Sequence, residues 1–260
     1  MSLTLAVTLV MLGGISGFAA GFLGIGGGVL LFPLLLYIPP CLGLESLDVK
    51  SVAALAITQV FCATLVGGAA HWRHGRVHGQ LVYVAAGATM AGSFLGGMAS
   101  RWVSEEFLLL LFGVVTLLAA AMMFLPAPPD VQEGMLQEKI VIHPLPLAVL
   151  AGLTGTVVGF LGAGNFLFVP LLIYVFKVPI RIAIGSNLII AVLSTFAGFV
   201  GKLLTGQVPF LMALVVVLGA GLGALGGERS HGQVSPHMLR YIYAGVVGLI
   251  AIRIWLTLLA

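Results

Sequence analysis

The stretch GFLGIGGG, from Gly21 to Gly28, decides the fold, because it interrupts an apolar run long enough to cross a membrane. Residues 3–22 have the length of roughly 20 apolar residues that a transmembrane helix needs. Four of the five residues from Gly24 to Gly28 are glycine, and glycine weakens the interior of a helix. The first helix is therefore predicted to end here, and a separate helix to begin at residue 28.

Nearly the same stretch, GFLGAGN, occurs from Gly159 to Asn165, 138 residues later. The segments 21–26 and 159–164 are identical at five of six positions, and PLLLY (33–37) matches PLLIY (170–174) at four of five. Further matches follow at a constant offset of 131 residues: Lys50 with Arg181, Gly67 with Gly198, Gly75 with Gly206, Gly92 with Gly223, and Val103 with Val234. Matches at a fixed offset indicate an internal duplication.

The composition indicates a membrane protein. Of the 260 residues, 60% are hydrophobic and 7% are charged, and the mean hydropathy is +1.20. Soluble globular domains carry about 25% charged residues, so this chain has too few charges to cover a water-facing surface. The apolar runs are continuous rather than alternating, which excludes a β-barrel. We therefore predict an all-α, polytopic transmembrane helical bundle.

Breaks of charged or proline-rich sequence divide the chain into ten predicted helical segments. These are residues 3–22, 28–38, 51–70, 80–100, 105–125, 146–162, 165–176, 182–201, 208–227 and 237–257. Most have the length of a membrane span, but 28–38 and 165–176 have 11 and 12 residues, about half of one. The polar residues 126–145 are predicted to link an N-terminal repeat, 1–125, to a C-terminal repeat, 146–260.

The orientation of the two repeats depends on whether each short segment completes a crossing. If it does, each repeat crosses five times and the repeats are inverted; if it does not, each crosses four times and the repeats are parallel. With five crossings each, seven basic residues lie on one side (Arg73, Arg76, Lys139, Lys177, Arg181, Arg229 and Arg240) and four on the other (Lys50, Arg101, Lys202 and Arg253). The alternative divides them more evenly, so the positive-inside rule favours inverted repeats with both termini outside.

The glycine breaks predict an anion site. Non-helical backbone at membrane depth is stable only where it is buried in protein or lines a wet cavity. A half-length helix after each break would place its unpaired N–H groups and positive dipole end near the midplane. We therefore predict that Gly26, Gly27 and Gly28 in one repeat, and Gly164 and Asn165 in the other, bind a small anion. The alternative is that these glycines only let helices pack closely.

Polar side chains inside predicted membrane helices complete the candidate site, because such residues are costly in lipid and indicate function. They are Thr58, Gln59, Ser186, Asn187 and Ser194, of which Asn187 is the strongest candidate. A Ser or Thr hydroxyl can instead bond to its own helix. Lys202 and His71 hold matching positions at the ends of their helices, and the alternative for both is a place among the lipid headgroups. The second repeat is the more polar, which predicts an asymmetric site.

Several other classes of function lack their sequence signals. No basic stripe indicates nucleic acid, no phosphate-binding loop indicates ATP, and Cys41 and Cys62 have no paired spacing. The histidines of HWRHGRVH (71–78) lack nearby carboxylates or thiols, so no metal and no cofactor are expected. No nucleophile–base motif indicates an enzyme.

The duplicated pattern GxxxGFLGxGGGxxLFPLLLY, from Gly17 to Tyr37, resembles the TauE/SafE sulfite exporter family. The resemblance covers essentially the whole chain, and implies a permease of the cell (inner) membrane linked to export of sulfite, sulfoacetate or related anions. Members often carry a Thr-Ser pair where this chain has Leu55-Ala56, so the resemblance also implies an asymmetric site.

These observations predict a secondary transporter, an exporter of a small sulfur-containing anion such as sulfite or an organosulfonate. The anion would bind near the membrane midplane, and one repeat would rock against the other. An anion channel of the same fold is the alternative, and a membrane-embedded enzyme is less favoured. The expected partners are the small anion and the lipid bilayer, with no nucleic acid; a homodimer is left open.

Overall fold

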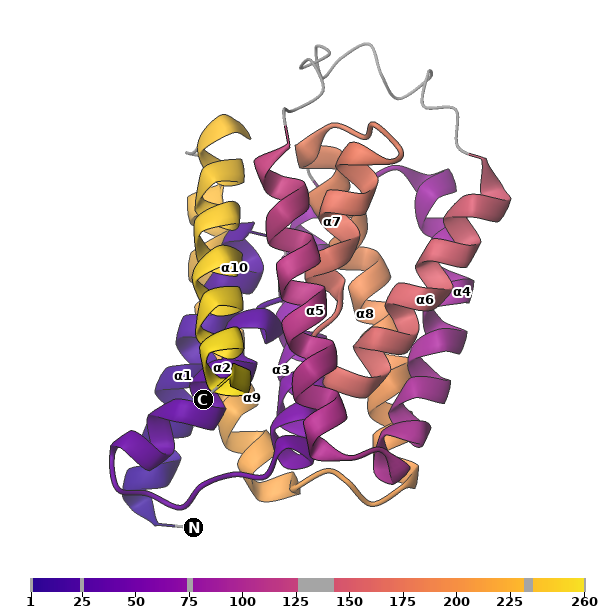
Figure 1. Cartoon of the computed structure of the whole chain (residues 1–260). Coiled ribbons are helices and arrows are strands. Elements are labelled where there is room, and N and C mark those ends of the chain that lie inside the picture. Colours follow the sequence, from indigo (N-terminus) through magenta and orange to yellow (C-terminus); the bar gives the residue numbers. More distant parts are fainter. Residues whose placement is uncertain (1, 24–25, 74–76, 126–142, 232–235, 260) are drawn as a thin grey trace.

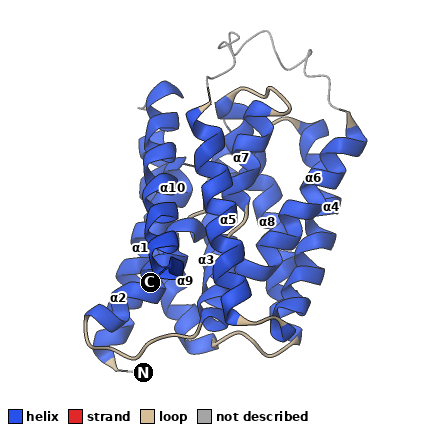
Figure 2. Ribbon diagram, in the orientation of Figure 1, coloured by secondary structure: helices blue, strands red, loops and turns tan. Residues whose placement is uncertain are grey.

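The helices of this protein follow the ten predicted segments closely. The computed structural model describes residues 2–23, 26–73, 77–125, 143–231 and 236–259, and within these ranges the secondary structure is helical, without strands (Figure 2). The first half forms α1 (Leu3–Leu23), α2 (Gly28–Cys41), α3 (Val49–Arg73), α4 (Gly79–Ala99), the short 3-10 helix η1 (Ser100–Trp102) and α5 (Glu105–Phe124). The second half forms α6 (Pro144–Leu161), α7 (Asn165–Tyr174), α8 (Ile180–Leu204), α9 (Phe210–His231) and α10 (Pro236–Leu259).

The prediction of an all-α membrane bundle is confirmed. Seven helices among the described residues are long and apolar enough to cross a membrane, and the two helices that follow the glycine breaks are shorter, with 14 residues in α2 and 10 in α7. The predicted linker, 126–145, lies largely outside the described residues, and α6 begins within its last two positions, at Pro144. The division into two repeats stays an interpretation of the sequence matches.

The most extensive contacts between helices of the two halves each have an equivalent contact between their counterparts. Helix α1 packs along α9, and α6, its counterpart, packs along α4; α3 lies against α8, and α5 against α10. Helix α1 starts at the lower end of the bundle in Figure 1, whereas α6 starts at the upper end. The two halves thus run in opposite directions, which is the arrangement that inverted repeats require.

Glycines allow these helix pairs to approach closely. A Cβ atom on Gly17 of α1 would overlap the carbonyl oxygen of Ala220, and one on Gly223 of α9 would overlap that of Gly14. The same holds where Gly96 of α4 meets α6. The hydrophobic effect does not drive helices together in lipid, so van der Waals contact between closely packed backbones contributes much of the free energy of helix association.

An aromatic cluster holds the two short helices in place. The ring of Phe112, on α5, stacks on Phe32 of α2 with the centroids 4.4 Å apart, and meets Phe166 of α7 edge-on at 6.2 Å. All three side chains are fully buried. Because α5 contacts a half-length helix from each half through one ring, it fixes their relative positions.

Candidate functional site

The two glycine breaks give each short helix an N-terminus inside the bundle. Gly26 and Gly27 have φ angles of 77° and 74°, and Gly162 has a φ of 68°. This left-handed region is open to glycine at little cost. Gly27 and Gly164 are the N-cap residues of α2 and α7, and neither helix has a side-chain cap. The chain turns at the predicted positions. The N–H groups of Leu30 and Leu167 donate to the carbonyl oxygens of Gly27 and Gly164, so the N–H groups that remain at the helix starts are those of Gly28, Val29 and Asn165.

The two breaks lie against each other. A Cβ atom on Gly28, the first residue of α2, would come within 2.9 Å of the Cβ of Ala163 and within 3.1 Å of the carbonyl oxygen of Gly162. Gly28 and Ala163 therefore touch, and the N-termini of α2 and α7 meet in the interior. All the described residues of both breaks are buried. Two positive helix ends at one place favour a negative charge there.

Gln59 of α3 lies at the first break. Its side chain is 0% exposed, and a Cβ atom on Gly27 would come 3.0 Å from its Nε2 atom. Neither Nε2 nor Oε1 has a hydrogen-bond partner. A buried amide without partners costs about 1–3 kcal/mol for each unsatisfied group, so Gln59 is a candidate for binding a ligand.

Asn165 supplies a second amide at the other break. It is the first residue of α7 and is 3% exposed. Its Oδ1 atom accepts a hydrogen bond of 3.3 Å from the hydroxyl of Ser194 on α8, and its Nδ2 atom has no partner. The structure thus brings together the glycines, Asn165, Ser194 and Gln59 around the contact between the two breaks.

Three other candidates have different contacts. The hydroxyl of Thr58 bonds to the carbonyl of Ala54 in its own helix at 2.8 Å. Ser186 is buried in α8, where its hydroxyl accepts the backbone N–H of His78 at 3.0 Å. Asn187, the strongest candidate from sequence, is fully buried beside it in α8. The hydroxyl of Thr58 is thus bonded within α3, and that of Ser186 is bonded to the residue that precedes α4, so neither is shown to face the breaks.

Lys202 lies inside the protein and not among the lipid headgroups. It is fully buried, and its Nζ atom donates to the hydroxyl of Ser100 at 2.7 Å and to the carbonyl oxygen of Phe160 at 3.2 Å. Phe160 is in the last turn of α6, directly before the second break. A cation at a helix C-terminus offsets the negative end of the helix dipole. The matching residue, His71, lies in α3, but its side chain is outside the described residues.

Sequence reasoning missed two buried groups near this region. Ser93 of α4 is fully buried, its hydroxyl has no partner, and a Cβ atom on Gly198 would overlap it. Ser100, which accepts the Lys202 ammonium, also bonds to Gln207 Oε1 at 2.8 Å. A lone serine in a glycine-rich helix carries no distinguishing sequence signal, so only the packing shows these contacts.

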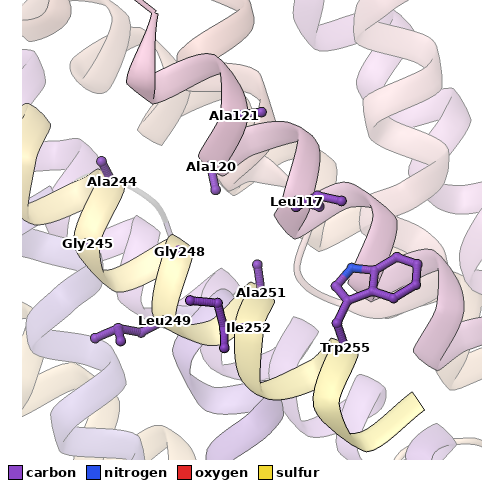
Figure 3. Close-up of a pocket in the computed structure, with 10 residues that line it drawn as sticks. All are labelled: Leu117, Ala120, Ala121, Ala244, Gly245, Gly248, Leu249, Ala251, Ile252 and Trp255. Carbon is purple, nitrogen blue, oxygen red and sulfur yellow. The ribbon is translucent and has the colours of Figure 1, made fainter. Parts of the chain in front are cut away.

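An apolar groove between α5 and α10 is the wrong kind of site for an anion. Its volume is about 520 Å³, within the range of small-molecule pockets. Small and aliphatic side chains line it, with Trp255 at one end (Figure 3). The indole N–H of Trp255 already donates to the carbonyl of Gly113 at 3.1 Å. The groove therefore offers no polar group to a charged ligand.

The described residues contain no group of three or more His, Cys, Asp or Glu side chains that could hold a metal ion. The chemistry that the two breaks offer is accordingly that of neutral donors: backbone N–H groups and side-chain amides. Such donors suit a small anion that must be released again, because a full cationic partner would hold it more tightly.

Comparison with known proteins places the chain among membrane transporters. The family model described as Sulfite exporter TauE/SafE matches residues 9–254. A probable membrane transporter protein of Xylella fastidiosa (strain 9a5c) is 28% identical over 270 residues, which cover 100% of both chains. The probable membrane transporter protein YjnA of Bacillus subtilis (strain 168) is 27% identical over 256 residues, 94% of this chain and 97% of the relative. No solved structure matches the chain.

Proposed function

This chain belongs to the TauE/SafE sulfite exporter family and is a multi-pass membrane transporter, and from this premise we propose that it exports a small sulfur-containing anion, such as sulfite or an organosulfonate. The anion binds where the N-termini of α2 and α7 meet. The amides of Gln59 and Asn165 and the N–H groups of the first helical turns supply its hydrogen bonds. The cell membrane is the site of transport.

The contact between Gly28 and Ala163 is the observation that carries this proposal. It joins two helix N-termini, one from each half, at a place where buried amide groups lack partners. Each half thus contributes one helix end to one site, which is how transporters with inverted repeats bind their substrates. Rocking of one half against the other then exposes the site to each side in turn.

The burial of the site favours a carrier over a channel. Gln59 and Asn165 are 0% and 3% exposed, so the site is closed to both sides in this conformation. A channel that conducts needs a continuous path, whereas a carrier passes through an occluded state. Counter-exchange of labelled for unlabelled anion across proteoliposome membranes distinguishes the two, because only the carrier is accelerated by substrate on the opposite side.

Sulfite uptake into proteoliposomes tests the proposed site. We expect wild-type protein to show saturable uptake. Asn165→Leu should lower kcat/KM at least about tenfold, because leucine keeps the branched shape of the asparagine side chain but lacks the amide that would bind the anion. Thr195→Val is the matched control: the Thr195 hydroxyl bonds to the carbonyl of Ala191 in its own helix, so uptake should stay close to wild type.

Unchanged uptake by Asn165→Leu would mean that the glycines of the breaks only permit close packing of the helices and do not form the site. The search for the site would then move to Asn187 and Lys202, two further buried polar side chains of α8 that sequence analysis identified. Sulfate, sulfoacetate and chloride as competing anions define the substrate class in the same assay.

A further inference from the structure

We propose that the site selects a singly charged, protonated sulfur oxyanion, such as hydrogen sulfite, over the doubly charged form, and that Gln59 makes this selection. The inference rests on the proposed function and adds the protonation state of the substrate. It follows from which atoms of the buried amides lack partners and from the charge that the helix ends supply.

Gln59 needs both a donor and an acceptor. Its Nε2 and Oε1 atoms are buried and both lack partners. The two amide positions are hard to tell apart by shape, but here the assignment does not matter, because either orientation leaves one N–H₂ group and one carbonyl oxygen unsatisfied. Only a ligand that accepts at one atom and donates at another satisfies this side chain.

Asn165 differs from Gln59 in one respect. Its Oδ1 atom already accepts from Ser194, so its Nδ2 group is what remains for a ligand. The site therefore offers two amide N–H₂ groups, the backbone N–H groups of Gly28, Val29 and Asn165, and one amide carbonyl oxygen, on Gln59. Sulfite as a dianion has only acceptors and would place a charged oxygen against Gln59 Oε1. Hydrogen sulfite donates its proton to that oxygen and accepts from the other groups.

The charge of the helix ends points the same way. Each helix N-terminus carries about half an elementary charge, so α2 and α7 together supply roughly one positive unit. This matches a monoanion, whereas a dianion would keep about one unit of charge uncompensated inside the bundle. Helices α1 and α6 end at the same two breaks, and their negative ends together carry about one unit of charge, which the ammonium of Lys202 at Phe160 offsets.

Charged and titratable groups of the surrounding helices lie mostly toward the helix ends. Lys50, Cys62, His71 and Arg73 are on α3; Tyr37 and Cys41 on α2; Glu105 and Glu106 on α5; Tyr174 on α7; Arg181 and Lys202 on α8; and Glu228, Arg229 and His231 on α9. Helices α1 and α6 carry no Asp, Glu, Lys, Arg or His. Lys50 is nine residues before Gln59, or about 14 Å along the helix, and the backbone of Glu228 packs against Gly21. The closest of these in sequence to Gln59 is the neutral thiol of Cys62.

Binding of three anions to the full chain in proteoliposomes tests this selection, with the same pH on both sides of the membrane. Sulfite changes from monoanion to dianion within the working range of pH. Methanesulfonate is a monoanion without a transferable proton, and sulfate is a dianion. We expect sulfite to bind roughly tenfold more tightly than methanesulfonate at acid pH. Its affinity should fall as pH rises and the dianion forms, while that of methanesulfonate stays flat. Sulfate should compete weakly throughout.

Two variants locate the selection at Gln59. Gln59→Met keeps a similar volume and removes both the donor and the acceptor, so sulfite and methanesulfonate should bind alike at acid pH, and the affinity for sulfite should fall less steeply as pH rises. A midpoint of thermal unfolding in detergent close to that of the wild type shows that this variant folds. Thr64→Val, on the same helix, is the control, because the Thr64 hydroxyl bonds to the carbonyl of Val60 and the preference should persist.

The outcomes separate this inference from the proposed function. If none of the three anions binds at any pH, both are overturned. If sulfite binds more tightly at high pH, or if sulfate competes as well as sulfite does at acid pH, the site takes dianions and this inference alone is wrong. If the preference for acid pH is as steep in Gln59→Met as in the wild type, the selection belongs to another residue. The wild-type profile decides the first two cases even if the variant does not fold.

Discussion

At the scale of single residues, the glycines of the breaks do two different things. Gly27 has a positive φ and also lies against α1, where a Cβ atom would overlap the carbonyl oxygen of Ser16. Gly28 instead leaves room for Ala163 of the other break. The absence of side chains therefore permits both the turn and the contact that brings the helix ends together.

A pair of alanine substitutions separates the backbone effect from the contact. Gly43 has a φ of 70°, close to that of Gly27, but nothing lies within 4 Å of the position of its Cβ. We expect Gly43→Ala to destabilise the protein by about 1 kcal/mol through its φ alone. Gly27→Ala should cost at least about 2 kcal/mol more, because the methyl group also meets the α1 backbone.

Thermal unfolding of both variants in detergent measures this difference. Equal losses of stability would show that α1 can shift to accept the methyl group. The contact at Gly27 would then contribute nothing beyond the conformational freedom of glycine.

At the scale of helices, the sequence predicted the ten segments well, but it does not show which glycines in the helices contact a neighbour. Gly92, Gly96, Gly97, Gly219, Gly223 and Gly227 do face the backbone of a neighbouring helix. Gly87 and Gly221 lie in the same helices, yet a Cβ atom on either would meet nothing within 4 Å. Helical spacing shows which glycines share a face, but only the neighbouring helix decides whether that face is covered.

Two glycines of α9 test this distinction. A Cβ atom on Gly223 would overlap the carbonyl of Gly14 and come 2.8 Å from the backbone N of Phe18, whereas Gly221 faces open space. We expect Gly223→Ala to lower stability by about 3 kcal/mol by pushing α9 from α1. Gly221→Ala should be neutral or stabilising by up to about 1 kcal/mol, since alanine favours a helix.

The midpoint of thermal unfolding, together with retained sulfite uptake for Gly221→Ala, measures both effects. A similar loss in the two variants would mean that α9 requires glycine for a reason other than its contact with α1.

At the scale of the whole molecule, the opposite directions of the two halves are what the proposed mechanism needs, because they would let one site between the halves serve both sides of the membrane. Basic residues assigned by sequence to one side do lie together: Lys50 Nζ donates to the carbonyl of Arg101 at 2.8 Å, and the ammonium of Lys202 is bonded to the neighbouring Ser100. A transporter needs only to tilt one half against the other to change which side reaches the breaks.

Cysteine labelling from one side of the membrane tests this arrangement. In a background with Cys41→Ser and Cys62→Ser, Ser2→Cys precedes α1 and His143→Cys precedes α6, and both positions are exposed. We expect a membrane-impermeant thiol reagent to reach them from opposite sides, with Ser2→Cys labelled from outside the cell. Labelling of both from the same side would indicate parallel halves.

The sequence by itself determined that this chain is a helical membrane protein, where its helices begin and end, and that two glycine-rich stretches interrupt them. These features depend on local composition and on short-range backbone preferences, which every residue carries with it. Only the tertiary structure decided that the two breaks touch at Gly28 and Ala163, that Gln59 rather than Thr58 faces them, and that Lys202 is buried against α6. Such contacts join residues far apart in the chain, and the close packing of several helices sets them.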